Sequence, residues 1–74
     1  MEKADSLVAA LGGRENITRV EACITRIRVE VNALDPVSED ELKEAGAHGV
    51  VVQQNNVVQI VVGPDAEDVA EHMV

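Results

Sequence analysis

Alternating β-branched residues in two separate stretches constrain the fold of this chain more than any other feature. In the first stretch, residues 17–31, the later half places Ile27 and Val29 on one face of a strand and charged residues on the other. The earlier half, residues 17–22, has a weaker strand pattern and is expected to pair with the later half. The stretch therefore predicts a β-hairpin with its turn at Cys23–Thr25.

The second stretch predicts another hairpin near the C-terminal end of the sequence. Its strands are Val50–Gln54 and Val57–Val62, and they are joined by Asn55-Asn56, residues that tolerate the positive φ angles of a tight turn. One face of the later strand carries only aliphatic residues: Val58, Ile60 and Val62. The other face includes the polar Gln59, so it is expected to point outwards, with Val57 and Val61 as partly exposed apolar positions.

Three short helical segments surround the hairpins. Apolar residues at helical spacing predict a first helix over Glu2–Leu11. Ser38 and Glu41 match a capping box at the start of a second helix, which Gly46 closes. Gly63-Pro64-Asp65 opens the last helix. The apolar side of that helix is expected to carry four residues: Val69, Ala70, Met73 and Val74.

The predicted element order is α-β-β-α-β-β-α. Hairpins impose antiparallel pairing, and three short helices can cover only one face of a four-stranded sheet. We therefore expect an α+β two-layer sandwich, in which a four-stranded antiparallel sheet is covered on one face by three helices. The other face is open to partners. A chain of 74 residues has room for one domain, residues 1–74.

The composition argues against several classes of function. The chain has no Phe, Trp or Tyr, so it lacks the aromatic platforms on which bases and sugars stack. Its net charge of -8 repels phosphate backbones and anionic membranes. No apolar run approaches the roughly 20 residues of a transmembrane helix. We expect a cytoplasmic monomer that neither binds nucleic acid nor inserts into a membrane.

The single cysteine lies among residues suited to phosphoryl chemistry. Arg26 and Arg28 follow Cys23 by three and five residues. Residues on one face of a strand recur about every 6.6 to 6.8 Å, so the two guanidinium groups can bracket one anion. Their charge favours the thiolate, and Thr25 adds a hydroxyl donor. Backbone N–H groups of the turn, such as that of Ile24, can complete an anion site. These residues indicate a cysteine that accepts a phosphoryl group.

The residues alone leave other functions open. Cys23 can be a structural residue of a small regulatory or binding module, or the reactive thiol of a redox sensor. A cysteine phosphatase is excluded, because its Cys-x5-Arg loop would need arginine where Val29 stands. A second cysteine is absent, so a thioredoxin-like pair is excluded as well. His48 and His72 are expected to be solvated, and we expect no metal and no cofactor.

Three segments of the chain resemble a known family. They are Leu7–Ile17, Ala22–Val29 with its Cys-x-Thr-Arg-x-Arg core, and Gly46–Val51. In these segments the chain resembles the B domain (EIIB) of the glucose and N-acetylglucosamine type of enzyme II. That enzyme is part of the bacterial phosphoenolpyruvate-dependent sugar phosphotransferase system. The resemblance extends from Leu7 to Gly63, and the motifs keep the family's order and spacing.

The resemblance implies that the domain is a phosphotransferase component, a relay for a phosphoryl group. The cysteine matching Cys23 would accept the group from a phosphohistidine on the A domain. It would then pass the group to a sugar held by the membrane-embedded C domain, and the arginines matching Arg26 and Arg28 would serve this second transfer. Contact with the C domain would bring the domain to the inner face of the membrane. The family's fold is the one predicted above.

Smaller features bear on the branch of the family. Glu21 stands where the family often has aspartate. Ala22-Cys23-Ile24 differs from the His-Cys-Ala of the β-glucoside and sucrose branch, which favours the glucose and N-acetylglucosamine branch. The segment Ala45–Gly49 favours N-acetylglucosamine. The sequence is compatible with a free-standing B protein and with a domain of a longer polypeptide.

Overall fold

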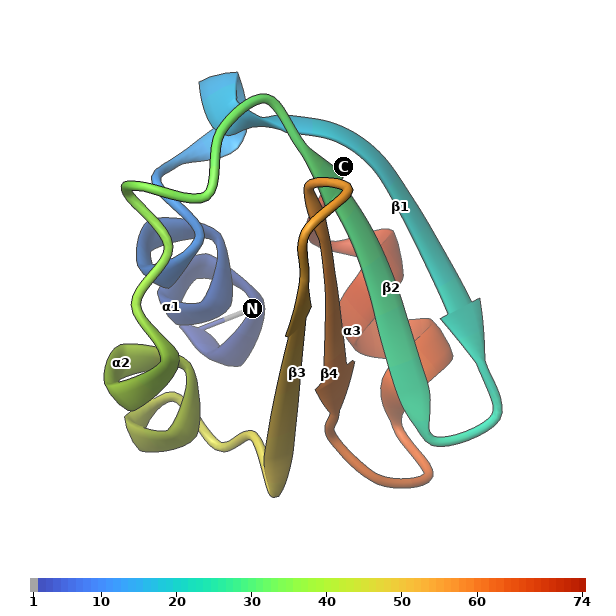
Figure 1. Cartoon of the computed structure of the whole chain (residues 1–74). Coiled ribbons are helices and arrows are strands. Elements are labelled where there is room, and N and C mark those ends of the chain that lie inside the picture. The colour runs from blue at the N-terminus through green and yellow to red at the C-terminus, as the bar shows by residue number, and fades with distance from the viewer. Residues whose placement is uncertain (1) are drawn as a thin grey trace.

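The computed structural model describes residues 2–74. The elements are α1 (Glu2–Ala10), η1 (Arg14–Asn16), β1 (Ile17–Cys23), β2 (Arg26–Val31), α2 (Glu39–Glu44), β3 (Gly49–Gln53), β4 (Val57–Val61) and α3 (Ala66–Glu71). The strands form one sheet in the order β1-β2-β4-β3, and all neighbouring pairs are antiparallel. The three α-helices pack on one side of this sheet (Figure 1). The predicted α+β two-layer sandwich is confirmed.

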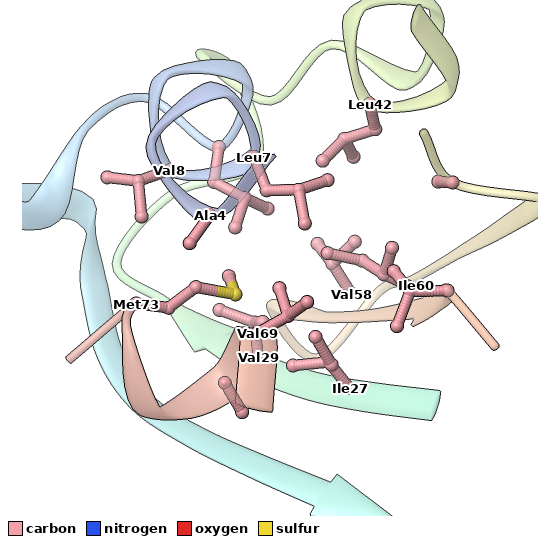
Figure 2. Close-up of a cluster of buried hydrophobic side chains, with 14 of the residues drawn as sticks. Ala4, Leu7, Val8, Ile27, Val29, Leu42, Val58, Ile60, Val69 and Met73 are labelled. Atoms are coloured by element: carbon pink, nitrogen blue, oxygen red, sulfur yellow. The ribbon is translucent and has the colours of Figure 1, made fainter. Parts of the chain in front are cut away.

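The core lies between the helices and one face of the sheet. Ile27 and Ile60, which are register partners on β2 and β4, are completely buried. Leu7, Leu42 and Val69 come from the three α-helices and point towards them (Figure 2). Because side chains alternate along a strand, burial of this set leaves the opposite set on the open face of the sheet. The strand alternation thus decides which residues can meet a partner.

The predicted orientation of β4 is confirmed, but one detail is wrong. Val58 and Ile60 are buried, and Val61 on the open face is partly exposed. Val57 is only 2% exposed, although it is not part of the core cluster. It lies on an internal strand between Glu30 and Gln53, so the longer side chains of its register partners flank it on both sides.

The ends of the helices also refine the prediction. The Ser38 hydroxyl accepts a hydrogen bond from the Glu41 backbone N–H, as expected of an N-cap. The Ser38 N–H donates to the carbonyl of Ala10 and so ties α2 to the end of α1. Val74 is 78% exposed instead of lying on the apolar side of a helix, because α3 ends three residues earlier at Glu71.

Within residues 2–74, no helix combines the length and the apolar character needed to cross a bilayer.

Candidate functional site

Cys23 lies at the end of β1, directly across from Arg26 at the start of β2. Only Ile24 and Thr25 connect the two strands, so the turn falls where the sequence predicts it. Cys23 and Ile24 are exposed, and Thr25 is half-buried. The thiol is therefore accessible at the end of a hairpin, and the register pair with Arg26 fixes the backbone position of Cys23.

The backbone of the turn is strained at Ile24. This residue has a φ of 56°, in the left-handed region that β-branched residues rarely occupy. A two-residue hairpin loop with positive φ at its first position ordinarily places glycine there. The isoleucine side chain is 78% exposed, so burial in the core does not compensate for the unfavourable backbone conformation. Such a conformation costs on the order of 1–3 kcal/mol and occurs preferentially at functional sites.

The other turn residue is anchored to the centre of the sheet. The carbonyl of Thr25 accepts two hydrogen bonds beyond the end of β4, from the N–H groups of Val62 (3.0 Å) and Gly63 (3.1 Å). Gly63 has a φ of 101°, which favours glycine. The sequence points to the hydroxyl of Thr25. The structure adds a role for its carbonyl, which fixes the turn against the neighbouring strand.

Register places the predicted site residues on the open face in two adjacent rows. The first row contains Cys23, Arg26, Val61 and Gly49. The second row contains Glu21, Arg28, Gln59 and Val51. The thiol and both guanidinium groups therefore belong to one surface, and all three side chains are at least partly exposed. The structure brings these three predicted side chains together.

The two arginines differ in their partners. Nη1 of Arg26 donates to Oε1 of Gln59 at 3.5 Å, and no carboxylate in residues 2–74 lies within 4.0 Å of this guanidinium. Nη1 of Arg28 instead donates to Oε2 of Glu30 at 3.2 Å. Arg26, which is across from the thiol, thus keeps its charge free for an incoming anion, whereas Arg28 already contacts one.

Arg28 belongs to a larger group of charged residues on the open face. The same Oε2 of Glu30 lies 3.9 Å from Nε of Arg19, and Arg19 also pairs with Glu21. We call these four residues the ion-pair ladder: Arg19, Glu21, Arg28 and Glu30. Glu30 and Gln59 are additional residues of this surface that were not among the site residues predicted from the sequence. The alternation along β2 carries a signal for Glu30, because it places residues 28 and 30 on one face.

The site is an open surface. Two hollows of about 210 and 330 Å³ border β1, but both lie towards the C-terminal end of the chain and neither is lined by Cys23, Arg26 or Arg28. His48 and His72 are exposed, as expected. An exposed thiol beside a guanidinium that contacts no carboxylate among residues 2–74 is suited to an anionic group presented by another macromolecule.

Comparisons with known proteins agree on one family. The family model described as phosphotransferase system, EIIB, matches residues 5–36. The chain is 52% identical over 68 residues to the PTS system N-acetylglucosamine-specific EIIB component of Streptomyces coelicolor, covering 92% of this chain and 87% of that protein.

Two further relatives are much longer proteins. The identity is 39% to the PTS system N-acetylglucosamine-specific EIICBA component of Klebsiella pneumoniae, covering 95% of this chain and 11% of that protein. It is 45% to the PTS system glucose-specific EIICBA component of Staphylococcus carnosus, covering 86% of this chain and 9% of that protein. The chain thus spans about a tenth of their length.

A solved structure has the same fold. It is one domain of the PTS system, IIabc component, from Clostridium difficile, with a TM-score of 0.78 and 22% sequence identity. The similarity covers 96% of this chain and 74% of the solved one.

Proposed function

Because this chain belongs to the EIIB family of the sugar phosphotransferase system, in its glucose and N-acetylglucosamine branch, we propose that it is a phosphocysteine carrier. In this proposal residues 1–74 form a single phosphotransfer domain, and Cys23 is its nucleophile. The observation that carries the proposal is the register pair of Cys23 and Arg26. It combines an exposed thiol with a guanidinium that no carboxylate in residues 2–74 neutralises.

The first transfer phosphorylates Cys23. The Sγ thiolate of Cys23 attacks the phosphorus of a phosphohistidine on the A domain. An S–P bond forms while the N–P bond breaks, and the imidazole nitrogen keeps the electron pair and takes up a proton. Arg26 stabilises the equatorial oxygens during this step, supported by the backbone N–H groups of Ile24 and Thr25 and by the Thr25 hydroxyl.

The second transfer consumes the phosphocysteine. A hydroxyl of a sugar bound by the C domain attacks the phosphorus, and an O–P bond forms while the S–P bond breaks. The hydroxyl proton leaves to a base outside this chain, and Cys23 returns to the thiolate. Arg26 and Arg28 position the phosphoryl group for the in-line reaction, because planar guanidinium groups bind phosphoryl oxygens in pairs.

The names of the relatives support these partners and a sugar. EIICBA names a component with C, B and A parts, which favours the A domain as donor and the C domain as site of the acceptor. N-acetylglucosamine is named for the Streptomyces coelicolor relative, of whose length the chain covers 87%. We therefore propose N-acetylglucosamine as the sugar. The domain would act at the inner face of the membrane through the C domain.

Mass spectrometry of the intact protein tests the carrier function. The domain is incubated with phosphoenolpyruvate, the general phosphotransfer proteins and a cognate A domain. We expect one added phosphoryl group, which is released by iodine and is absent in Cys23→Ser. If the A domain becomes phosphorylated and the intact domain does not, the proposal is wrong. The module with a structural cysteine and the thiol redox sensor would then be the remaining explanations.

A further inference from the structure

We propose that Glu30 is a positioning residue that holds Arg28 in the resting domain and yields it to the phosphoryl group on Cys23. This inference rests on the proposed function and adds a residue to it. It concerns the ion-pair ladder, in which one carboxylate oxygen contacts two guanidinium groups. In the resting domain, Arg28 contacts Glu30; in the phosphorylated domain, it contacts the phosphoryl oxygens.

The resting contact is close, yet it can be exchanged. Oε2 of Glu30 lies 3.2 Å from Nη1 of Arg28, and the two side chains are 37% and 41% exposed. Exposed ion pairs of this kind contribute only about 0–1 kcal/mol, so a stronger anion can displace Glu30. A phosphoryl group carries about -1.5 to -2 charges near neutral pH, compared with the single charge of the carboxylate.

Arg28 lies within reach of the phosphorylated thiol. Its register partner is Glu21, which precedes Cys23 by two residues on β1. The step along β1 is about 6.7 Å and the step between strands about 5 Å, so the Cα atoms of Arg28 and Cys23 are separated by roughly 8 Å on the same face. A long arginine side chain and a phosphorylated cysteine can meet across this distance.

Another residue of the ion-pair ladder, Arg19, stays close to Glu30 after Arg28 has moved. Nε of Arg19 lies 3.9 Å from the same Oε2, and Arg19 is the register partner of Glu30. Glu30 therefore keeps a cation nearby when it loses Arg28. The exchange requires a change of Arg28 side-chain rotamer and no change in the backbone of the sheet. Such a movement can accompany each cycle of phosphorylation.

Glu30 should then affect the two transfers in opposite directions. In Glu30→Gln, Arg28 has lost its charged partner and adds to the positive potential beside the thiolate. We expect phosphorylation of Cys23 to become about two- to fivefold faster. Transfer from phosphocysteine to sugar should become slower by a similar factor, because an Arg28 without a competing carboxylate stabilises the phosphocysteine ground state. A general loss of stability would slow both steps, so the opposite changes distinguish positioning from a structural effect.

Single-turnover kinetics of both transfers test this consequence, with Glu67→Gln as the control. Glu67 is an exposed carboxylate on α3, on the helical side of the sheet, and its removal changes the net charge by the same amount. Opposite changes in Glu30→Gln with unchanged rates in Glu67→Gln support the inference. Equal slowing of both transfers, or no change in either, would overturn it.

A second experiment needs no phosphoryl donor. Cys23 of the intact domain is alkylated with iodoacetate, which adds a carboxylate, or with iodoacetamide, which adds a neutral group of similar size. NMR then follows the Arg28 Nε–Hε signal and the Glu30 carboxyl carbon. We expect both signals to shift only with the anionic adduct. Equal shifts with the two adducts, or none with either, would overturn the exchange.

The two proposals can fail separately. If the carboxymethyl adduct shifts the Arg28 and Glu30 signals but the A domain never phosphorylates Cys23, the exchange of Arg28 is supported and the carrier function is overturned. If Cys23 is phosphorylated while Arg28 remains with Glu30, the carrier function holds and the positioning role of Glu30 is overturned.

Discussion

Arg26 and Gln59 are joined across the centre of the sheet, where Nη1 of the arginine lies 3.5 Å from Oε1 of the amide. The two residues belong to neighbouring strands, β2 and β4, and to adjacent rows of the open face. An amide can orient a guanidinium without neutralising it. This contact therefore orients the arginine nearest to Cys23 and leaves its full charge available.

The first prediction replaces this amide by a carboxylate. Gln59→Glu should slow phosphorylation of Cys23 about three- to tenfold, because the new charge pairs with Arg26 and repels the incoming phosphoryl group. Two unit charges 4 Å apart interact by about 1 kcal/mol in water and more at a protein surface, and 1.36 kcal/mol is tenfold in rate. Quenched-flow kinetics of phosphoryl transfer from a phosphorylated A domain measure the rate.

Gln53→Glu is the matched control. Gln53 lies on the same face, at the far end of β3 from the Cys23 row. The same charge added there should leave the rate within about twofold, because solvent screens exposed charges beyond about 8–10 Å. Equal slowing by both variants would mean that overall charge, and not the contact with Arg26, limits the reaction.

The second prediction separates charge from geometry at the two arginines. Arg26→Lys and Arg28→Lys keep the positive charge but lose the planar pair of donors. Transfer to sugar should therefore suffer more than phosphorylation of the thiol, by about tenfold or more if one well-placed donor is lost. The measurement compares thiol phosphorylation with sugar phosphate formation in membranes that contain the C domain. Both lysine variants delivering phosphate to sugar at the original rate would contradict the assignment.

The third prediction concerns the backbone at Ile24. Ile24→Gly removes the side chain from a residue with a φ of 56° and should stabilise the fold by about 1 kcal/mol, less the entropy that glycine adds to the unfolded chain. Transfer should nevertheless slow, because glycine makes the turn more flexible and removes an exposed apolar side chain beside Cys23. Urea unfolding and transfer kinetics measure the two effects.

The other hairpin provides the control for Ile24→Gly. Asn56 has a φ of 64°, and the β3–β4 turn that contains it lies at the opposite end of the strands from Cys23. Asn56→Gly should change stability by less, because asparagine tolerates this conformation. Its transfer rates should remain at the original values. If Ile24→Gly is more stable and transfers at the original rate, the strained turn has no part in the reaction.

The sequence predicts the fold well because, in so small a domain, short local sequence patterns indicate which residues are buried. The period-2 pattern around Ile27 and Val29 shows which face of β2 is buried, and the half of the capping box made by Ser38 is found in the structure. The order of strands in the sheet is less local. β2 and β4 are not consecutive in the sequence, so no hairpin signal pairs them.

The part of the site that depends on this non-local pairing could not be predicted. Arg26 meets Gln59, and Thr25 binds Gly63, only because β4 lies beside β2. The cysteine and the arginines, by contrast, are neighbours in one hairpin, and sequence alone places them on one surface. The strain at Ile24 had no local signal either, since isoleucine is an unfavourable residue at such a position.

The fourth prediction tests the anchor of the turn. Gly63→Ala places a side chain at a φ of 101° and should destabilise the fold by about 1–3 kcal/mol. It should also loosen the hydrogen bond from the Gly63 N–H to the Thr25 carbonyl and slow both transfers. Hydrogen exchange of the Gly63 amide reports the loosening directly, at a temperature where the variant is folded.

Gly13→Ala separates the anchor from the loss of stability. Gly13 has a similar φ of 92°, open space around its Cα and a place between α1 and η1, away from Cys23. Its stability should fall comparably, while transfer in the folded protein should continue at the original rate. Comparable slowing by both variants would show that stability alone, without the anchor, explains the effect of Gly63→Ala.

The last prediction concerns the surface that the partners would share. Val51 is 51% exposed and lies in the row of Arg28 and Gln59 on the open face. Apolar groups ringed by polar ones commonly form docking surfaces, and successive partners of one phosphocysteine must both cover it. Val51→Asp should therefore weaken binding of the A domain about tenfold, measured by NMR shift mapping, and the C domain should compete for the same surface.

Val74→Asp introduces the same change at a more exposed valine beyond α3 and should leave binding unchanged. Equal effects of the two variants, or shifts confined to the helical side around Leu42 and Val69, would contradict docking on the open face.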